Sequence, residues 1–346
     1  MQLSFRWYGP NDPVTLENIR QIPGMRGIVT SLHDIAPGEV WSEEAIEGRA
    51  LMVQNQGLEI TVIESVPVHE DIKMGKSSRE RYVENYQETL RNLAKHGIQT
   101  VCYNFMPLFD WLRTSLTLRL PDGSTTLAYD DAMVDEEALL GGRLRLPAWD
   151  LDADKDKLRE MHAYYRSMSE DALWENLGYF VERVMPVAKE LGIKMTIHPD
   201  DPPWSVVGIP RIIKNRNDLL RLLSLYDDEA NGICFCSGSL GSSDENDLPE
   251  MMREFGTMGR IHFVHLRNVL RTGHHSFYES GHLSENGSVD MYELMKVMHQ
   301  LGYQGPMRPD HGRMVWGETG NPGYGLFDRA LGATYFNGLW EAISKA

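Results

Sequence analysis

Cysteine is scarce in this sequence, which has 3 among 346 residues, at positions 102, 234 and 236. A small, odd number at these spacings provides no disulfide framework, so we expect a reducing compartment and predict a cytoplasmic protein. The N-terminus, MQLSFRWYG, lacks the basic stretch and apolar run of a signal peptide. No apolar run approaches the roughly 20 residues that a membrane helix needs, so a membrane partner is not expected.

Basic residues are also few relative to acidic residues. The sequence has 34 Lys and Arg against 50 Asp and Glu, a formal net charge of -16. Such a field repels phosphate backbones and therefore argues against nucleic acid as a partner. It does not attract an anionic small molecule either, so any bound acid must meet local cations. No G-x-G-x-x-G motif follows the first expected strand, which removes support for dinucleotide binding, and nothing repeats at a solenoid period.

Short apolar segments alternate with helical patterns along the chain, and hydrophobic residues make up 42% of it. The pattern predicts an α/β fold, a TIM (β/α)8 barrel that forms a single domain over residues 1–346. We expect its strands at 3–7, 25–30, 58–64, 98–105, 193–197, 232–236, 260–266 and 306–308. We expect its main helices at 14–21, 41–56, 77–96, 170–191, 217–226, 248–258, 289–301 and 327–344.

The alternation breaks after the fourth expected strand, at about residues 107–169. Within this insertion, LRLPDGSTTL predicts a hairpin that turns at Asp122 and Gly123, and an acidic stretch and LDADKDKLRE follow. We expect the insertion to sit on the barrel, where it can act as a lid. A second irregular stretch, RTGHHSFYESGHLSENGS, is interpreted as a polar loop, with His274, His275 and His282 solvated or facing a substrate.

Four metal-binding side chains stand at the ends of the last four expected strands. Because side chains alternate faces along a strand, His198, Cys236 and His265 should each lie at the C-terminal mouth of the barrel, where barrel enzymes keep their sites. Asp310 follows the last strand. Each residue has a plainer explanation, such as a buried cysteine or a helix-capping aspartate, but together they predict one divalent cation site. A thiolate, two imidazoles and a carboxylate suit Zn²⁺ or Fe²⁺ better than Mn²⁺.

Several polar residues near the same strand ends are candidates for substrate binding. Arg6 and Tyr8 end the first strand, where they can bind a carboxylate or plug the barrel. Arg267 and Asn268 lie just past the seventh strand, where they too can bind a carboxylate or plug the barrel. Asn104 lies near the end of the fourth strand and is expected to point into the mouth.

Two further residues are candidates for a reaction site. His311 stands beside Asp310 at a strand end, and a carboxylate next to an imidazole suits a reaction site better than a core. Tyr324 lies between Gly323 and Gly325 in a loop that can move over a ligand. The plainer interpretation of Tyr324 is a surface aromatic in a turn.

Five stretches in order along the chain resemble one known family. They are FRWYG, TIHPDDPP, FCSGSLG, FVHLRN and VDMYELMKVMHQLGYQGPMRPDHGR. These resemble mannonate dehydratases, bacterial enzymes of hexuronate (glucuronate) breakdown, and the likeness runs from Phe5 to Phe336. The resemblance implies a barrel close to that of xylose isomerases. It also implies dehydration of D-mannonate to 2-keto-3-deoxy-D-gluconate with Mn²⁺ or Fe²⁺, by removal of the C2 proton and loss of the C3 hydroxyl.

The resemblance also implies roles for single residues. It assigns the metal to the same four strand-end residues and proton transfer to His311 and Tyr324, while the choice of acid and base stays open. A bound cation would stabilise the charge that develops on the substrate, and Arg6 or Arg267 can add a clamp on its carboxylate. Because the resemblance favours Mn²⁺ and ligand chemistry favours other ions, we expect Mn²⁺ first and leave Fe²⁺ open. Relatives imply a homodimer or a larger homo-oligomer.

Three other functions compete with a dehydratase. A sugar isomerase or epimerase can use the same metal-binding barrel. A metal-dependent endonuclease can too, although the acidic balance opposes it. A non-catalytic protein that binds a sugar acid is the third, and the complete donor set argues against it.

Overall fold

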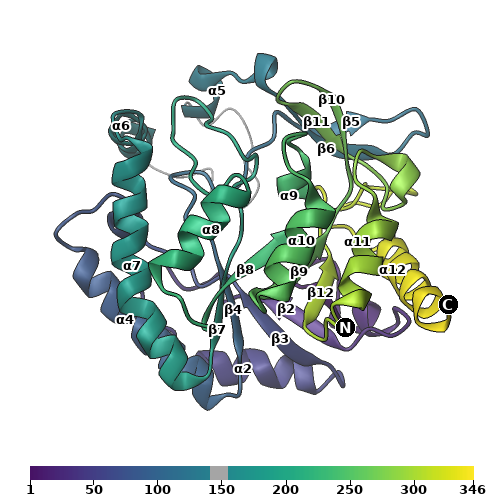
Figure 1. The fold of residues 1–346 in the computed structure, drawn as a ribbon, viewed down its shortest axis with the longest axis horizontal. Coiled ribbons are helices and arrows are strands. Elements are labelled where there is room, and N and C mark those ends of the chain that lie inside the picture. Colours follow the sequence, from purple (N-terminus) through teal and green to yellow (C-terminus); the bar gives the residue numbers. More distant parts are fainter. Residues whose placement is uncertain (141–154) are drawn as a thin grey trace.

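The structure is a computed structural model that describes residues 1–140 and 155–346. Its centre is a closed barrel of parallel strands in the order β1-β12-β9-β8-β7-β4-β3-β2 (Figure 1). The strands are β1 (Gln2–Arg6), β2 (Gly27–Thr30), β3 (Glu59–Glu64), β4 (Thr100–Tyr103), β7 (Lys194–Ile197), β8 (Asn231–Cys236), β9 (Ile261–Leu266) and β12 (Pro306–Pro309). Each overlaps a segment expected from the sequence, so the predicted fold class is confirmed.

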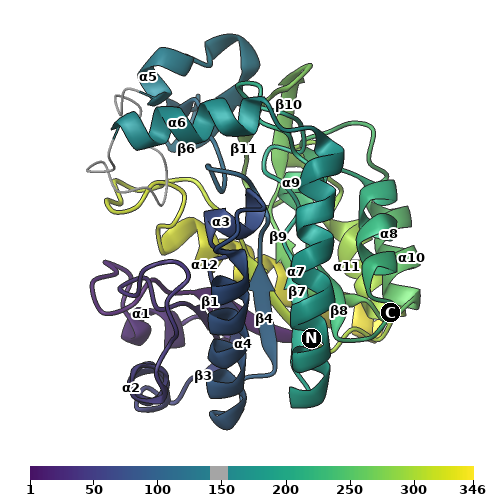
Figure 2. The ribbon, with the colours of Figure 1, turned by 90° about the vertical axis from the view of Figure 1, so that its left-hand side faces the viewer.

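Eight helices cover the outside of the barrel, as Figures 1 and 2 show. They are α1 (Leu16–Arg20), α2 (Glu43–Gln54), α4 (Arg79–Lys95), α7 (Glu170–Leu191), α8 (Arg216–Leu225), α10 (Leu248–Thr257), α11 (Met291–Gln300) and α12 (Phe327–Lys345). None of the described helices combines the length and the apolar character needed to cross a membrane.

Local signals explain why α7 begins and ends where it does. The Ser169 side chain accepts a hydrogen bond from the Ala172 backbone N–H and caps the first turn. Gly192 ends the helix in the left-handed conformation, with φ of 68°, which glycine adopts without a steric penalty. The face between these caps is apolar at helical spacing and is buried against its neighbours, including Leu173, Leu177, Phe180, Val181 and Val184.

The interior of the barrel contains a small apolar layer. Val29, Val62, Cys102, Cys234 and Phe263 pack together there, all nearly free of solvent contact. Cys102 therefore belongs to the core. The layer excludes water from below the strand ends that carry the polar residues.

A second, smaller sheet lies at one end of the barrel and is called the accessory sheet below. It is four-stranded, in the order β10-β11-β6-β5. Its strands are β5 (Ser115–Arg119), β6 (Thr125–Asp130), β10 (Val269–Gly273) and β11 (Ser276–Glu279). The hairpin of β5 and β6 was predicted, and Gly123 stands in its turn with φ of 87°. Figures 1 and 2 place α5 (Glu136–Leu140) and α6 (Lys155–Arg166) at the same end.

The prediction of a polar loop after β9 is wrong in part. Much of that stretch forms the β10–β11 hairpin instead. β11 pairs antiparallel with β6, with Phe277 opposite Tyr129. The partner strand lies far away in the sequence, so no local pattern revealed the pairing. The expected solvation is also wrong for His282, which is 3% exposed and lies 3.8 Å from the Asp328 carboxylate.

Two short helices and two 3-10 turns complete the described chain: α3 (Glu70–Lys73), α9 (Ser237–Gly241), η1 (Asp131–Met133) and η2 (Ser284–Asn286). Of these, α9 matters most for the site because it follows β8 directly. The part of the predicted insertion at 141–154 lies outside the described residues.

Two glycines give a matched test of helix stability. A Cβ added at Gly192 or at Gly48 would meet nothing within 4 Å, so packing does not decide either substitution. Gly192→Ala should lower the free energy of unfolding by about 1 kcal/mol because alanine is strained at positive φ. Gly48→Ala, inside α2, should raise it by about 0.5–1 kcal/mol. Urea unfolding curves measure both, and shifts of the same sign would contradict the argument.

Candidate metal and proton-transfer site

The register of the parallel strands brings the predicted metal ligands together. Cys236 at the end of β8 lies opposite His265 on β9, and His265 lies opposite Arg308 on β12. Asp310 follows β12, and His198 follows β7. Because neighbouring strands run in parallel and in this register, all these side chains reach the same end of the barrel.

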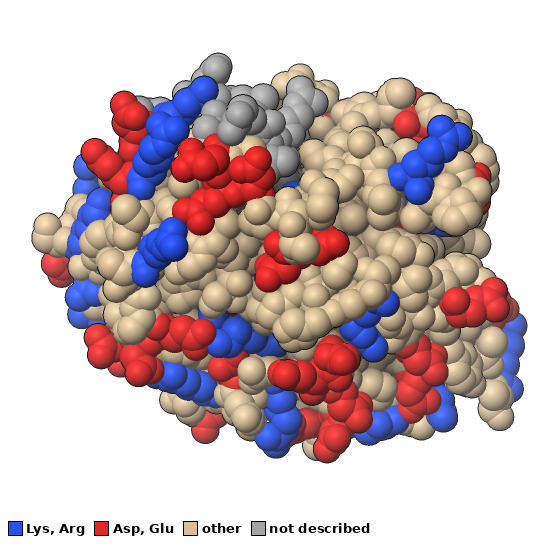
Figure 3. All heavy atoms as spheres, turned by 90° about the horizontal axis from the view of Figure 1, so that it is seen from above, with Lys and Arg blue, Asp and Glu red and all other residues tan. Residues whose placement is uncertain are grey.

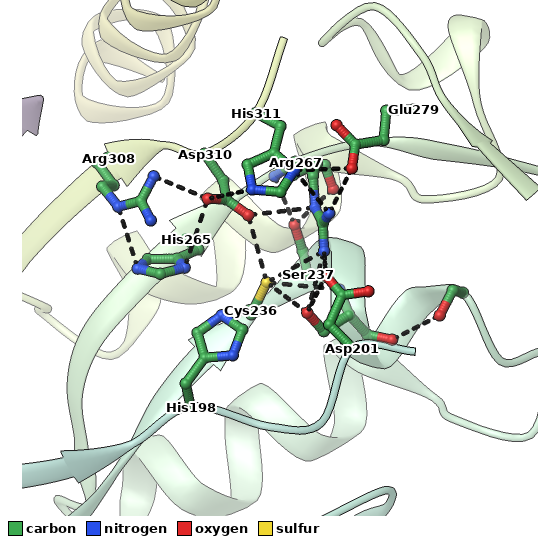
Figure 4. A network of polar contacts seen from close by, with 12 residues as sticks. His198, Asp201, Cys236, Ser237, His265, Arg267, Glu279, Arg308, Asp310 and His311 are labelled. Atoms are coloured by element: carbon green, nitrogen blue, oxygen red, sulfur yellow. Dashed lines mark hydrogen bonds and ion pairs between the residues drawn. The ribbon is translucent and has the colours of Figure 1, made fainter. Parts of the chain in front are cut away.

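The donor atoms of these residues lie close to one another. One ligand atom each from Cys236, His265 and Asp310 falls within 4.8 Å of the others, and all three residues are buried. The Cys236 Sγ is 3.7 Å from Asp310 Oδ2, and the His265 Nδ1 is 3.8 Å from Asp310 Oδ1. His198 faces the group, with its ring centroid 5.0 Å from that of His265 (Figure 4). A second group within the same limit joins His198, Cys234 and His265.

One nitrogen of each imidazole faces the donor cluster (Figure 4). The His198 Nδ1 is 2.7 Å from the Pro199 carbonyl oxygen; since a carbonyl only accepts, Nδ1 carries the proton and Nε2 keeps its lone pair. The His265 Nδ1 is buried and has no hydrogen-bond partner among the described residues, an arrangement that is costly unless a ligand satisfies it. The other ring nitrogen of His265, Nε2, accepts a hydrogen bond from the Arg308 Nε over 3.1 Å and lies 3.4 Å from a Glu64 carboxylate oxygen.

The surroundings of Cys236 favour the thiolate, which is the form that binds metals. Burial raises the pKa of this thiol, but the positive charge of Arg267 opposes burial and holds the pKa well below its usual value. The backbone N–H and the hydroxyl of Ser239, in α9, lie 3.4 Å and 3.2 Å from the sulfur. The four donors therefore form a set that fits a divalent cation.

The two predicted proton-transfer residues are in direct contact. The His311 Nε2 lies 2.7 Å from the Tyr324 hydroxyl. The Gly312 N–H donates to the Gly323 carbonyl oxygen over 2.8 Å, which holds the tyrosine loop against His311. A Cβ at Gly323 would lie 2.5 Å from the Leu127 side chain of β6, so glycine is needed for this close approach. Burial raises the pKa of Tyr324 well above its usual value, and the phenol keeps its proton.

A buried network of alternating charges surrounds this pair (Figure 4). The Glu279 Oε1 lies 2.7 Å from His311 Nδ1, from an Arg267 nitrogen and from an Arg113 nitrogen. Asp201 accepts hydrogen bonds from both arginines, at 2.7–3.0 Å. Burial raises the pKa of Glu279, but the neighbouring imidazole and guanidinium groups oppose it and bring the pKa to about 2. Each buried charge therefore has an opposite charge beside it, as burial requires.

A glycine makes room for the central arginine of this network. A Cβ at Gly238, in α9, would lie 1.9 Å from the Arg267 Nε. The guanidinium therefore lies across the backbone of α9, where it also reaches Asp310 Oδ2 at 3.2 Å. Arg267 was one of the two arginines considered for a clamp on a substrate carboxylate, but its nitrogens lie against carboxylates of the protein itself.

Arg6 and Tyr8 lie beside the proton-transfer pair. The Arg6 guanidinium contacts the backbone carbonyl of Glu64 and lies 3.2 Å from the His33 Nε2. Its carbon is 4.7 Å from the centre of the Tyr8 ring. The Tyr8 ring meets the Tyr324 ring edge-on, with centroids 4.9 Å apart.

The two predicted asparagines differ in their surroundings. The Asn104 side chain is half-buried, and its oxygen accepts from the Met106 N–H over 3.2 Å. Asn268 is fully buried, donates to the Leu283 carbonyl oxygen and accepts from the Val289 N–H. These bonds indicate that Asn268 holds the backbone in place, and they leave its amide little capacity for a substrate.

Sequence reasoning missed five charged residues of the site: Glu64, Arg113, Asp201, Glu279 and Arg308. Two of them carried a usable signal. Arg308 precedes Asp310 by two positions, and Glu64 is the last residue of an expected strand, so period-two alternation could have found both. The Arg308 nitrogens lie 3.1 Å from the Glu64 carboxylate and 2.7 Å from that of Asp310. Arg113 comes from the insertion and Glu279 from the supposed loop, where no pattern marked them.

The outer surface at this end does not gather charge of one sign. In Figure 3, acidic and basic side chains are interspersed over the described part of the face seen from above. An anionic substrate would therefore meet its cations inside the site, where the guanidinium groups of Arg6, Arg267 and Arg308 are buried.

Comparisons with known proteins give a consistent result. A family model described as D-mannonate dehydratase (UxuA) matches residues 1–346. Mannonate dehydratase 2 of Halalkalibacterium halodurans is 57% identical, with 100% of each chain covered. The mannonate dehydratase of Thermotoga petrophila is 55% identical and covers 100% of this chain and 98% of its own.

Comparisons with solved structures lead to the same family and fold. The crystal structure of mannonate dehydratase from Streptococcus suis serotype 2 has a TM-score of 0.93 and 48% sequence identity, and the match covers 100% of this chain and 95% of that one. A xylose isomerase domain protein from Planctomyces limnophilus has a TM-score of 0.57 at 12% identity over 100% of this chain and 98% of its own, which shows the shared fold alone. With its full length matched by the family model and by these relatives, the chain belongs to the D-mannonate dehydratase family.

Proposed function

We propose that this protein converts D-mannonate to 2-keto-3-deoxy-D-gluconate in a metal-dependent dehydration. The observation that carries the proposal is the position of the donor cluster beside the proton-transfer pair. Asp310 belongs to the cluster and the adjacent His311 to the pair, so a substrate that touches the donors also meets the imidazole and the phenol. Family membership supports the choice of substrate.

The residues proposed to hold the cation are His198, Cys236, His265 and Asp310. We propose Mn²⁺ as the ion, with Fe²⁺ as the alternative, because the family resemblance favours Mn²⁺ although the donor types suit softer ions. When bound, the cation would stabilise the negative charge that develops on the substrate as the C2 proton leaves.

We assign the base to His311 and the acid to Tyr324. The His311 Nδ1 faces the Glu279 carboxylate, which only accepts, so Nε2 has the lone pair that takes the proton from C2. The Tyr324 phenol keeps its proton because burial raises its pKa, and it gives that proton to the C3 hydroxyl. The C3–O bond then breaks, water leaves, and the enol that remains tautomerises to the 2-keto acid.

The contact between His311 and Tyr324 lets both groups return to their starting protonation states. After one turnover His311 has gained a proton and Tyr324 has lost one. The 2.7 Å separation of Nε2 and the phenol oxygen lets the proton return directly. Both groups are then ready for the next substrate without exchange with solvent.

Arg6 is the arginine proposed to bind the substrate carboxylate. The hydrogen-bond partners of its guanidinium are a backbone carbonyl and the His33 imidazole. Burial and the nearby Arg6 charge lower the pKa of His33 to about 3, so this imidazole stays neutral. Arg6 therefore keeps a positive charge that these bonds do not cancel, whereas Arg267 is neutralised by Asp201 and Glu279.

Compartment and assembly stay predictions. A cytoplasmic location and a homodimer or larger homo-oligomer are expected, and light scattering on the purified protein would measure the assembly.

The function is tested by removing and restoring the metal. Protein treated with a chelator should lose activity on D-mannonate, and Mn²⁺ should restore it best, with formation of a 2-keto-3-deoxy acid as the readout. Full activity after chelation would refute the metal dependence, and best restoration by Zn²⁺ would refute the choice of ion.

Turnover of xylose with no change to mannonate would favour an isomerase. A bound divalent ion with no product from any aldonate would favour a sugar-acid binding protein.

Two cysteine variants distinguish a proposed metal ligand from a cysteine of the apolar layer. Cys236→Ala removes a proposed ligand and should lower metal affinity by at least about tenfold, with loss of turnover. Cys102→Ala removes a buried thiol of the apolar layer and should leave both properties close to wild type. Metal content after dialysis, measured by atomic emission, gives the comparison. Equal metal retention in the two variants would exclude Cys236 as a ligand.

Two further variants test proton transfer. His311→Gln and Tyr324→Phe should each lower kcat about 10²–10⁴-fold, the usual contribution of a general acid or base, while metal stays bound. Tyr303→Phe is the matched control, because it removes a buried hydroxyl that donates to the Pro306 carbonyl oxygen at the start of β12. Near-normal rates in both test variants would show that the assignment is wrong.

A further inference from the structure

We propose that Glu279 is a positioning residue that holds the His311 ring in the tautomer and orientation needed for proton transfer, and that the accessory sheet serves to deliver it. The inference rests on the proposed function, since it concerns the same proton-transfer pair. It assigns a role to a residue outside the barrel strands and to a sheet that carries none of the proposed metal ligands.

The hydrogen bonds around His311 define its tautomer. Nδ1 lies 2.7 Å from Glu279 Oε1 and 3.1 Å from an Arg267 nitrogen. A carboxylate accepts and a guanidinium donates, so Nδ1 can bond to only one of them at a time. The arginine nitrogen already donates to the same Glu279 oxygen over 2.7 Å. The shorter, charge-assisted contact of the imidazole is with Glu279, and Nδ1 therefore carries the proton.

This tautomer determines what the other side of the ring can do. With Nδ1 protonated, Nε2 has a lone pair and accepts a hydrogen bond from the Tyr324 phenol, 2.7 Å away. Glu279, His311 and Tyr324 thus form a carboxylate–imidazole–hydroxyl series in which every donor has an acceptor. When Nε2 takes a proton, the Glu279 charge beside the ring stabilises the imidazolium, the part that a buried carboxylate takes in hydrolase triads.

The accessory sheet supplies the glutamate and keeps it in place. Glu279 is the last residue of β11, and its backbone carbonyl accepts from the Thr126 hydroxyl of β6, 153 positions away, over 2.7 Å. Arg113, which precedes β5, lies 2.7 Å and 3.1 Å from Oε1 through two nitrogens. The insertion after β4 therefore holds both the strand and the carboxylate. His311 comes from the barrel, so the two sheets meet at its ring.

Glu279 could instead serve only to neutralise the buried arginines. The two roles differ in what happens when His311 is absent. A residue that acts through His311 loses its influence on the rate once the imidazole is gone, whereas a residue that only neutralises Arg113 and Arg267 keeps it.

The first part of the test uses two variants of Glu279 in the metal-loaded protein with D-mannonate. Glu279→Gln keeps the size but removes the charge, and Glu279→Asp keeps the charge but moves it away from the ring. Both should lower kcat about 10²–10³-fold while KM changes less than about threefold and metal content is unchanged. Tyr278→Phe, on the opposite face of the same strand, should stay near wild type. A loss confined to KM or to metal content would overturn the proposal.

The second part is a double-mutant cycle with His311→Gln. In that background, Glu279→Gln should lower the residual rate by less than about threefold. The same fold-loss as in the wild-type background would show that Glu279 does not act through His311 and would overturn the proposal. If Glu279→Gln does not fold, the same cycle is measured with Glu279→Asp, because aspartate keeps a negative charge to neutralise the two arginines. If wild type and Tyr278→Phe form product but the effects of Glu279→Gln and His311→Gln are additive, this inference alone is refuted. If neither wild type nor Tyr278→Phe forms product, the proposed function is refuted as well.

Discussion

Pairing of buried charge is the constraint on which this site depends. Arg113, Arg267, Asp201 and Glu279 are each at most 2% exposed. Taking an ion out of water costs several kcal/mol, and removing one member of a buried pair typically costs about 3–5 kcal/mol. Such a cluster is tolerated only if opposite charges alternate at hydrogen-bond distance. That requirement holds each carboxylate and each guanidinium in one position, and the imidazole of His311 is held with them.

Arg267 joins the two halves of the site. On one side it lies 3.2 Å from Asp310 and 3.8 Å from the Cys236 sulfur, both proposed metal ligands. On the other side it contacts Glu279, which faces His311. The same positive charge that favours the thiolate thus also helps to neutralise the carboxylate behind the imidazole. The proposed metal site and the proposed proton-transfer pair are linked through one buried side chain, which has space only because Gly238 has no Cβ.

The fold by itself does not define the chemistry. A structural neighbour at 12% identity shares the barrel and is named as a xylose isomerase domain protein, so a barrel of this type accompanies more than one named activity. What differs is the set of groups at the strand ends. The strand ends present the donors of the proposed cation site, whereas the accessory sheet presents the carboxylate that faces the proposed base. A function is therefore better argued from the residues at the mouth than from the strand order.

Much of the site was predictable from local patterns. Eight strand segments were recognised from short apolar runs, and period-two alternation then selected His198, Cys236 and His265 as residues at the mouth. The choice of Asp310 followed from its position after the last strand. The roles of His311 and Tyr324 came from the family resemblance. Arg308 and Glu64 lay within reach of the same alternation argument.

The sequence by itself determined the barrel and the residues at its strand ends, because both follow from spacing along one continuous segment. Only the tertiary structure decided that Glu279 faces His311, since β11 pairs with β6, where the paired residues lie 146–150 positions apart, and such pairing leaves no local pattern. It also decided which polar side chains remain available. Asn268 and Arg267 are polar in the sequence, but the fold uses their hydrogen-bonding groups within the protein, and only the three-dimensional arrangement shows where each donor is directed.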